Sequence, residues 1–203
     1  MSADHYFTAE PDAPLRRSEI EFSVAGKNYR LVVASGVFSA GRLDPGTAVL
    51  LRKATLPTVT TEGTLLDLGC GYGPITCVLA TEAPQATVWA VDVNSRAREL
   101  TTENTKKYEK RVKVAEPGDV PADITFDEIW SNPPTHVGKA ELHVLMERWL
   151  PRLAPAGTAW LVINRNLGGD SLHTWLTGLG WQVERIASQR GFRVLRVTRN
   201  SAD

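Results

Sequence analysis

The sequence lacks three features that would each point to a particular class of protein. It has only 2 cysteines, Cys70 and Cys77, which is too few for a disulfide framework, and their spacing fits no metal site. No apolar run approaches the roughly 18 residues of a membrane span. The first residues also lack the basic start and apolar core of a signal peptide. We therefore expect a cytoplasmic protein with no membrane or metal partner.

The chain also lacks net charge. Lysine and arginine total 23, and aspartate and glutamate total 23. A balanced charge gives no global attraction to polyanions, so any contact with RNA must be local. With 203 residues, 42% of them hydrophobic, the chain is long enough for one well-buried α/β domain.

The pattern of apolar residues predicts an N-terminal extension followed by one larger domain. Residues 19–24 and 29–33 alternate apolar and polar around a Gly-containing turn, which predicts a β-hairpin. Asp44 followed by proline predicts a helix start, with the helix running to about residue 54. We predict an extension over 1–43 and a main domain over 44–203, within one globular unit.

The main domain alternates strand-like and helix-like segments, as in a parallel sheet covered on both faces. Strands are predicted near 64–68, 87–91, 111–115, 126–131 and 157–163, and helices near 74–82, 94–109 and 138–153. A helix near 170–179 and strands at 181–187 and 191–199 follow. The turn at 188–191 is short, so the last strand should run antiparallel.

A glycine-rich turn follows the first strand of the main domain. The segment Thr64–Pro74 runs from an apolar strand into glycines at alternate positions, and the next strand ends in Asp92. This carboxylate comes about 20 residues later, where Rossmann-like folds bind ribose hydroxyls. The third glycine comes one position too early for a dinucleotide fingerprint, and Asp67 beside the loop would repel phosphate. The pattern indicates a nucleoside with a cationic amine, and S-adenosylmethionine fits that description.

The second motif is Asn132-Pro133-Pro134-Thr135, directly after the strand at 126–131. Two prolines end a strand and stiffen the turn. Such a turn can hold the Asn132 side chain and the Pro133 carbonyl as fixed acceptors facing an amino group. We predict that these acceptors take the two N–H bonds of a planar amine and stabilise the charge that develops on it.

Together the two motifs resemble motifs I and IV of class I S-adenosylmethionine-dependent methyltransferases that act on planar amines. The resemblance covers nearly the whole chain and is closest to small-subunit ribosomal RNA guanine-N2 methyltransferases of the RsmC type, in single-domain bacterial form. It rests on the two motifs and on four further segments in the same order: 5–7, 36–39, 42–47 and 137–139. It implies an α/β fold with a Rossmann-like seven-stranded methyltransferase sheet, mostly parallel with the last strand antiparallel, and an N-terminal β-hairpin extension.

The resemblance implies roles for individual residues. The implied catalytic residues are Asn132, Pro133 and Pro134. The implied cofactor-binding residues are Asp67, Gly69, Cys70, Gly71, Gly73, Asp92, Val93, Asp119, Phe38 and Thr47. The implied substrate-binding residues are Thr135, Lys139, Arg42 and Arg165.

Three of these assignments have open alternatives. Asp119 is equally an ordinary aspartate of a Pro-Gly turn, and Phe38 can be a core residue. Thr135 stands where related enzymes often have an aromatic residue that stacks on the target base. Either another aromatic serves, with Phe38, Tyr72 and Tyr6 as candidates, or the base is held less tightly.

The resulting hypothesis is a monomeric enzyme that methylates guanine N2 in small-subunit (16S) ribosomal RNA, with ribosomal RNA or the small subunit as partner. Two alternatives remain open. One is methylation of another planar amine, such as protein glutamine N5 or adenine N6. The other is a ribosome- or RNA-binding protein that keeps the methyltransferase fold without catalysis.

Overall fold

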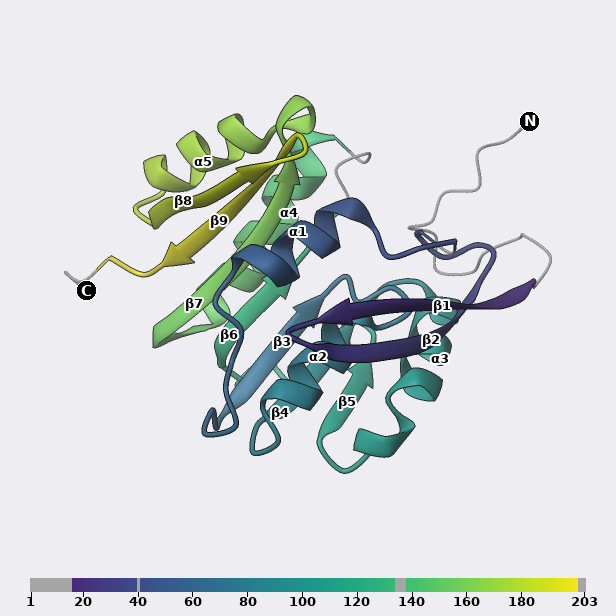
Figure 1. Ribbon diagram of the computed structural model, residues 1–203. Helices are drawn as coiled ribbons and strands as arrows, with labels where there is room; N and C mark the ends of the chain where they lie inside the picture. The colour runs from purple at the N-terminus through teal and green to yellow at the C-terminus, as the bar shows by residue number, and fades with distance from the viewer. Residues whose placement is uncertain (1–15, 40, 134–137, 201–203) are drawn as a thin grey trace.

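The computed structural model describes residues 16–39, 41–133 and 138–200, and its centre is a seven-stranded sheet (Figure 1). The strand order is β5-β4-β3-β6-β7-β9-β8, with β9 antiparallel to both of its neighbours. The strands are β3 (Thr64–Leu68), β4 (Thr87–Val91), β5 (Val112–Ala115), β6 (Phe126–Ser131), β7 (Leu153–Asn164), β8 (Gln182–Gln189) and β9 (Phe192–Thr198). The predicted seven-stranded sheet with an antiparallel last strand is therefore confirmed.

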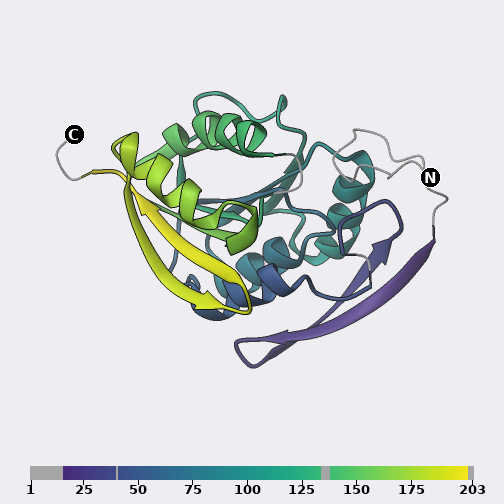
Figure 2. The same cartoon turned by 90° about the horizontal axis from the view of Figure 1, so that it is seen from above.

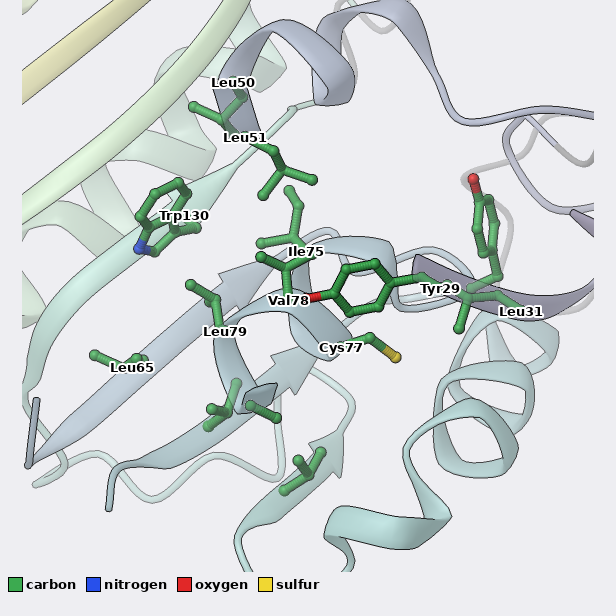
Figure 3. Packing of buried hydrophobic residues seen from close by; sticks show 14 of the residues in the cluster. Tyr29, Leu31, Leu50, Leu51, Leu65, Ile75, Cys77, Val78, Leu79 and Trp130 are labelled. Atoms are coloured by element: carbon green, nitrogen blue, oxygen red, sulfur yellow. The ribbon is translucent and has the colours of Figure 1, made fainter. Parts of the chain in front are cut away.

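Helices cover both faces of this sheet, as Figure 2 shows from above. They are α1 (Pro45–Lys53), α2 (Pro74–Glu82), α3 (Ser95–Asn104), α4 (Lys139–Trp149) and α5 (Gly169–Gly178). Helices α1, α2 and α3 lie over one face, and α4 and α5 over the other. The two faces have separate hydrophobic clusters. Figure 3 shows the first of them, where Leu51 of α1 lies above Ile75 and Val78 of α2.

Alternation along the strands decides which side chains reach each face. Leu65 of β3 packs toward α2, whereas Leu66 and Leu68 pack in the cluster under α4. Because successive side chains of a strand point to opposite faces, Asp67 shares the α2 face with Leu65. On β6, Trp130 likewise lies on the α1 and α2 face. Asn132 lies two positions after Trp130, just past the end of the strand. Its side chain therefore points to the same face as Trp130.

The N-terminal hairpin consists of β1 (Arg17–Val24) and β2 (Lys27–Ala34), which form a separate two-stranded sheet. Its turn is only two residues long, Ala25 and Gly26, and both have positive φ, as the type I′ turn requires. The hairpin lies along the outer side of α2 and α3 (Figures 1 and 2). The Asn104 side chain of α3 binds it by accepting from Val32 N and donating to Val32 O, each at 2.8 Å.

The largest differences between the predicted and observed boundaries are in three elements, α4, α3 and β7. The predicted helix 138–153 stops at Trp149, because Pro151 cannot donate the next helical hydrogen bond, and residues 150–152 form a 3₁₀ turn. The predicted helix 94–109 stops at Asn104, whose side chain instead binds β2, and a 3₁₀ turn follows at 106–108. Strand β7 begins four residues before the predicted 157, with an irregular register against β6 at the point where Gly157 meets the Phe126 carbonyl.

Candidate active site

A cavity of about 240 Å³ opens at the carboxyl ends of the central strands. In a parallel α/β sheet this edge is where ligands bind, since the loops after the strands converge there. The cavity is lined by Val37, Phe38, Ser39, Asp44, Thr47, Leu68, Gly69, Cys70, Gly71, Tyr72, Pro74, Ile75, Val91, Asp92, Val93, Ala97, Pro117, Asn132, Pro133, Leu145, Asn164 and Phe192. Both sequence motifs therefore meet in one cavity.

The glycine loop between β3 and α2 forms one wall. Gly69 and Gly71 have φ of 79° and 57°, a backbone region that other residues rarely adopt, and no described residue occupies the space where a Cβ would stand. Gly73 also has positive φ, but its missing Cβ faces Thr101 of α3, with the Oγ1 atom 3.0 Å from that position. Gly69 and Gly71 thus open the wall to a ligand, and Gly73 allows α2 and α3 to pack closely.

Asp92 links this loop to the end of β4. Its Oδ2 accepts from Gly71 N at 2.9 Å and its Oδ1 from Asn94 N at 2.9 Å. Burial raises the pKa of the Asp92 carboxyl, while these backbone donors act in the opposite direction. A carboxylate oxygen can accept more than one hydrogen bond. The Asp92 side chain can therefore still accept hydrogen bonds from a ligand in the cavity.

Asp67 lies beneath the loop and does not line the cavity. Its side chain is fully buried, and its Oδ2 accepts from Thr76 N at 2.8 Å and Thr76 Oγ1 at 2.5 Å. Its Oδ1 has no hydrogen-bond partner among the described residues. Burial raises the pKa of Asp67 to about 7. In this position Asp67 secures the start of α2, and its predicted contact with the cofactor stays a prediction.

The raised pKa of Asp67 predicts a pH-dependent stability. The folded protein holds a proton on this carboxyl between the ordinary pKa of 3.8 and about 7, whereas the unfolded chain releases it. The free energy of unfolding should therefore fall as pH rises through that window. Denaturant titrations of the wild type and Asp67→Asn between pH 4.5 and 8 isolate this contribution, because the amide does not titrate. A stability difference between the two proteins that stays constant with pH would contradict it.

Asn132 is held in one orientation at the opposite side of the cavity. Its Nδ2 donates to Asp44 Oδ1 at 2.7 Å and to Thr47 Oγ1 at 3.0 Å. A carboxylate only accepts, so the amide nitrogen must face Asp44, and the Asn132 Oδ1 atom is left as the acceptor. Asp44 is itself fixed as the N-cap of α1, where Oδ1 accepts from Thr47 N at 2.8 Å.

Cys70 lines the cavity but does not supply a nucleophile. The side chain is buried, and burial together with the nearby Asp92 carboxyl raises the pKa of the thiol well above its ordinary value. A thiol with a raised pKa stays protonated and unreactive at neutral pH.

Within the described ranges, no group of three His, Cys, Asp or Glu side chains is arranged to hold a metal ion. No helix within those ranges is long and apolar enough to cross a membrane.

The structure brings together most, but not all, of the residues singled out from the sequence. Phe38, Thr47, Gly69, Cys70, Gly71, Asp92, Val93, Asn132 and Pro133 line the cavity. The Asp119 side chain is exposed and does not line the cavity. Pro117, in the same turn, lines the cavity instead. Arg42, Lys139 and Arg165 are exposed and also outside the lining. Pro134 and Thr135 lie outside the described residues, so their predicted roles stay predictions.

Asn164 and Phe192 are among the lining residues that sequence analysis missed. Asn164 is the last residue of β7, and its place at a strand's carboxyl end could have suggested it. Phe192 is the first residue of β9 and enters the cavity from a hairpin near the end of the chain. No local pattern distinguishes Phe192 from a core residue.

Comparison with known proteins assigns the family. The model for the methyltransferase small domain matches residues 28–196. The chain belongs to this family. It is a class I S-adenosylmethionine-dependent methyltransferase, as the sequence motifs predicted, and it is similar to enzymes of the RsmC type.

Relatives of this methyltransferase differ in length. It is 31% identical to YbxB of Bacillus subtilis (strain 168), a protein described as uncharacterized, over 96% of this chain and 98% of that protein. It is 35% identical to ribosomal RNA small subunit methyltransferase C of Pseudomonas aeruginosa (strain UCBPP-PA14), over 95% of this chain but 58% of that enzyme. The methyltransferase therefore spans little more than half the length of this second relative.

A solved structure shares its fold. The Thermus thermophilus 16S rRNA N2 methyltransferase RsmC, in complex with AdoMet and guanosine, matches with a TM-score of 0.69 and 24% identity. The match covers 93% of this chain and 52% of that one. At this identity the likeness confirms the fold of the methyltransferase.

Proposed function

We propose that this methyltransferase transfers a methyl group from S-adenosylmethionine to the exocyclic N2 amine of a guanine in small-subunit ribosomal RNA. The observation that carries the proposal is the Asn132 amide, held by Asp44 and Thr47 so that its oxygen serves as a fixed acceptor in the cavity. The relatives named as ribosomal RNA small subunit methyltransferases support the choice of substrate.

The residues of the cavity fit the cofactor. Gly69 and Gly71 leave room for close approach of a ligand to the backbone, and Asp92 offers carboxylate oxygens for ribose hydroxyls. Val93 is 42% exposed beside Asp92 and gives an apolar surface for an adenine ring. When bound, S-adenosylmethionine supplies an electrophilic methyl group. The Asp92 carboxylate in the lining disfavours a phosphate-bearing ligand in the same place.

The chain's own residues orient the amine. The nitrogen on guanine C2 shares its lone pair with the ring and is a poor nucleophile until the pair is turned out of conjugation. Asn132 Oδ1 and the Pro133 carbonyl take its two N–H bonds, fix its direction and stabilise the positive charge that develops on it. No general base is needed, because the methylated ammonium is strongly acidic and loses a proton to water.

Contacts with the rest of the RNA are assigned to exposed cations near the cavity. Arg42 precedes α1, Lys139 begins α4, and Arg165 directly follows β7, and all three side chains are exposed. Such side chains bind phosphates without reading sequence. Because the chain has no net charge, these local contacts have to supply the attraction.

The direct test is nucleoside mass spectrometry of ribosomal RNA from cells with and without the protein. We expect N2-methylguanosine to be lost from 16S ribosomal RNA in its absence and restored in vitro by wild-type protein with S-adenosylmethionine. The matched control is addition of Asn132→Ala, which should restore little. Loss of N6-methyladenosine instead, or methylation of a glutamine side chain with unchanged RNA, would contradict the guanine assignment. If calorimetry detects no binding of S-adenosylmethionine, the proposal that the protein is an active methyltransferase is contradicted.

A further inference from the structure

The cavity extends along the sheet edge from β4 to β9 and has two distinct ends. Asp92 and Val93 follow β4, the glycine loop follows β3, Asn132 follows β6, and Phe192 begins β9. With strands about 4.8 Å apart, this path of four strand intervals spans roughly 19 Å. The proposed cofactor residues occupy the β4–β3 end. The β6–β9 end is left for the substrate.

Three side chains share one sheet face at that second end. Asn164 and Phe192 are paired across β7 and β9, and side chains of directly opposite residues lie on the same face. Asn164 has the parity of Trp160 and Val162, which lie in the cluster under α1. Asn132 has the parity of Trp130 in that same cluster. Asn132, Asn164 and Phe192 therefore converge beneath the N-terminus of α1.

Gly46 allows the Phe192 ring to approach the Asn132 site. A Cβ on Gly46 would stand 2.9 Å from Phe192 Cε1 and 3.0 Å from Asp44 Oδ1. The ring and the carboxylate that holds Asn132 thus meet at the same point, which only glycine leaves open. Phe192 is half-buried, so its ring packs on the core and still lines the cavity.

The other aromatic residues of the cavity are placed less well for this substrate. Tyr72 is 2% exposed, with its ring buried among core residues. Phe38 lies in a loop that is bound to the β4 end, where Gly36 O accepts from Asn94 Nδ2 at 3.3 Å and Ser35 O accepts from Arg96 Nη1 at 2.8 Å. Phe38 therefore belongs to the cofactor end. Among the described aromatic residues of the cavity lining, this leaves Phe192 as the one beside Asn132.

The rim around Phe192 is cationic. Arg190 precedes it in the β8–β9 turn, and Arg165 N donates to Gly191 O of that turn at 2.8 Å. Both arginine side chains are exposed. Arg190 has a φ of 52°, a strained value for a residue other than glycine or asparagine. An aromatic face with cations at its rim suits a base joined to phosphates better than an amino-acid side chain.

We propose that Phe192 is the platform on which the target base stacks, replacing the aromatic that the Asn-Pro-Pro-Thr motif lacks. This inference rests on the proposed function and deepens it, because it makes the substrate of this site a nucleobase in RNA. Phe192 holds the ring plane while Asn132 and Pro133 hold the exocyclic amine. Phe192 is then the residue that selects a flat base over a linear amide.

Fluorescence of 2-aminopurine tests the platform, because this base carries the same exocyclic amine on C2 and is quenched when it stacks on an aromatic ring. The probe is a five-nucleotide RNA with 2-aminopurine at its centre and uridine on both sides, titrated with protein and S-adenosylhomocysteine. The wild type and Phe192→Tyr should bind and quench it. Phe192→Leu should weaken binding by about tenfold or more and lose the added quenching.

Phe22→Leu is the matched control, since it makes the same change at a half-buried phenylalanine of β1 that lies outside the cavity lining. It should quench as the wild type does. Thermal midpoints and S-adenosylhomocysteine affinity establish that each variant is folded, and Phe192→Met replaces Phe192→Leu if the latter is not. If Phe192→Leu binds and quenches the probe as the wild type does, the platform is overturned. It is also overturned if Phe38→Leu, which removes the other exposed aromatic of the cavity, loses the quenching and Phe192→Leu keeps it.

The same set of proteins separates this inference from the proposed function. Suppose that the wild type methylates guanine in ribosomal RNA and that Phe192→Leu keeps the wild-type KM for RNA and the wild-type quenching. The platform is then wrong and the proposed function stands. If the wild type modifies no ribosomal RNA but quenches the probe through Phe192, the function is wrong and the base-binding site stands.

Discussion

Asn132→Ala is expected to lower kcat for RNA methylation on the order of 10²-fold or more, the typical effect of removing one acceptor or donor that acts in a transition state. The alanine removes the oxygen that Asp44 and Thr47 hold toward the amine. Binding of S-adenosylmethionine, measured by calorimetry, should stay near wild type, because Asn132 lies at the substrate end of the cavity. Near-wild-type turnover in this variant would rule out its catalytic role.

Asp44→Ser is the companion variant, and it separates positioning from stability. Asp44 both caps α1 and accepts from Asn132 Nδ2. Serine is also a good N-cap, so the helix keeps a cap otherwise worth about 1 kcal/mol. The shorter side chain is not expected to reach Asn132. We expect kcat to fall with little change in KM or thermal midpoint, and an unchanged kcat would show that Asp44 does not orient the amide.

Asp92→Ala is expected to weaken S-adenosylmethionine binding on the order of 10²-fold, given about 1.5–3 kcal/mol for each hydrogen bond to a charged group. The substitution also removes the acceptor for Gly71 N and so loosens the glycine loop. Because burial raises the pKa of Asp92, affinity should also fall in the wild type as pH is lowered and the carboxylate is protonated. Calorimetry across pH measures both effects.

Asp119→Ala is the control for this second prediction. The sequence predicts an adenine contact for Asp119, but the side chain is exposed and outside the cavity lining. A loss of affinity in Asp119→Ala would support that predicted contact, and wild-type affinity would contradict it. Wild-type affinity in Asp92→Ala would overturn the ribose assignment and with it the proposed orientation of the cofactor.

The sequence was sufficient for the order of the elements and for the two motifs that line the cavity. Alternating apolar residues, the glycine loop and the proline pair are local signals, and each acts through backbone geometry that neighbouring residues impose. For this reason strands β3, β4 and β6 and helix α2 were predicted with their observed bounds. Boundaries failed where side chains had distant partners, as at Asn104, which ends α3 and binds the N-terminal hairpin.

By itself, the sequence determined the family, the methyltransferase sheet and the two motifs that face each other across the cavity. Only the tertiary structure decided what each motif residue touches. It placed Asp67 under α2, joined Asn132 to Asp44 across 88 positions of sequence, and brought Phe192 beside them through Gly46. The physical reason is that backbone turns are set by adjacent residues, whereas side-chain orientation in a site is set by partners that are adjacent only after the sheet and helices have packed.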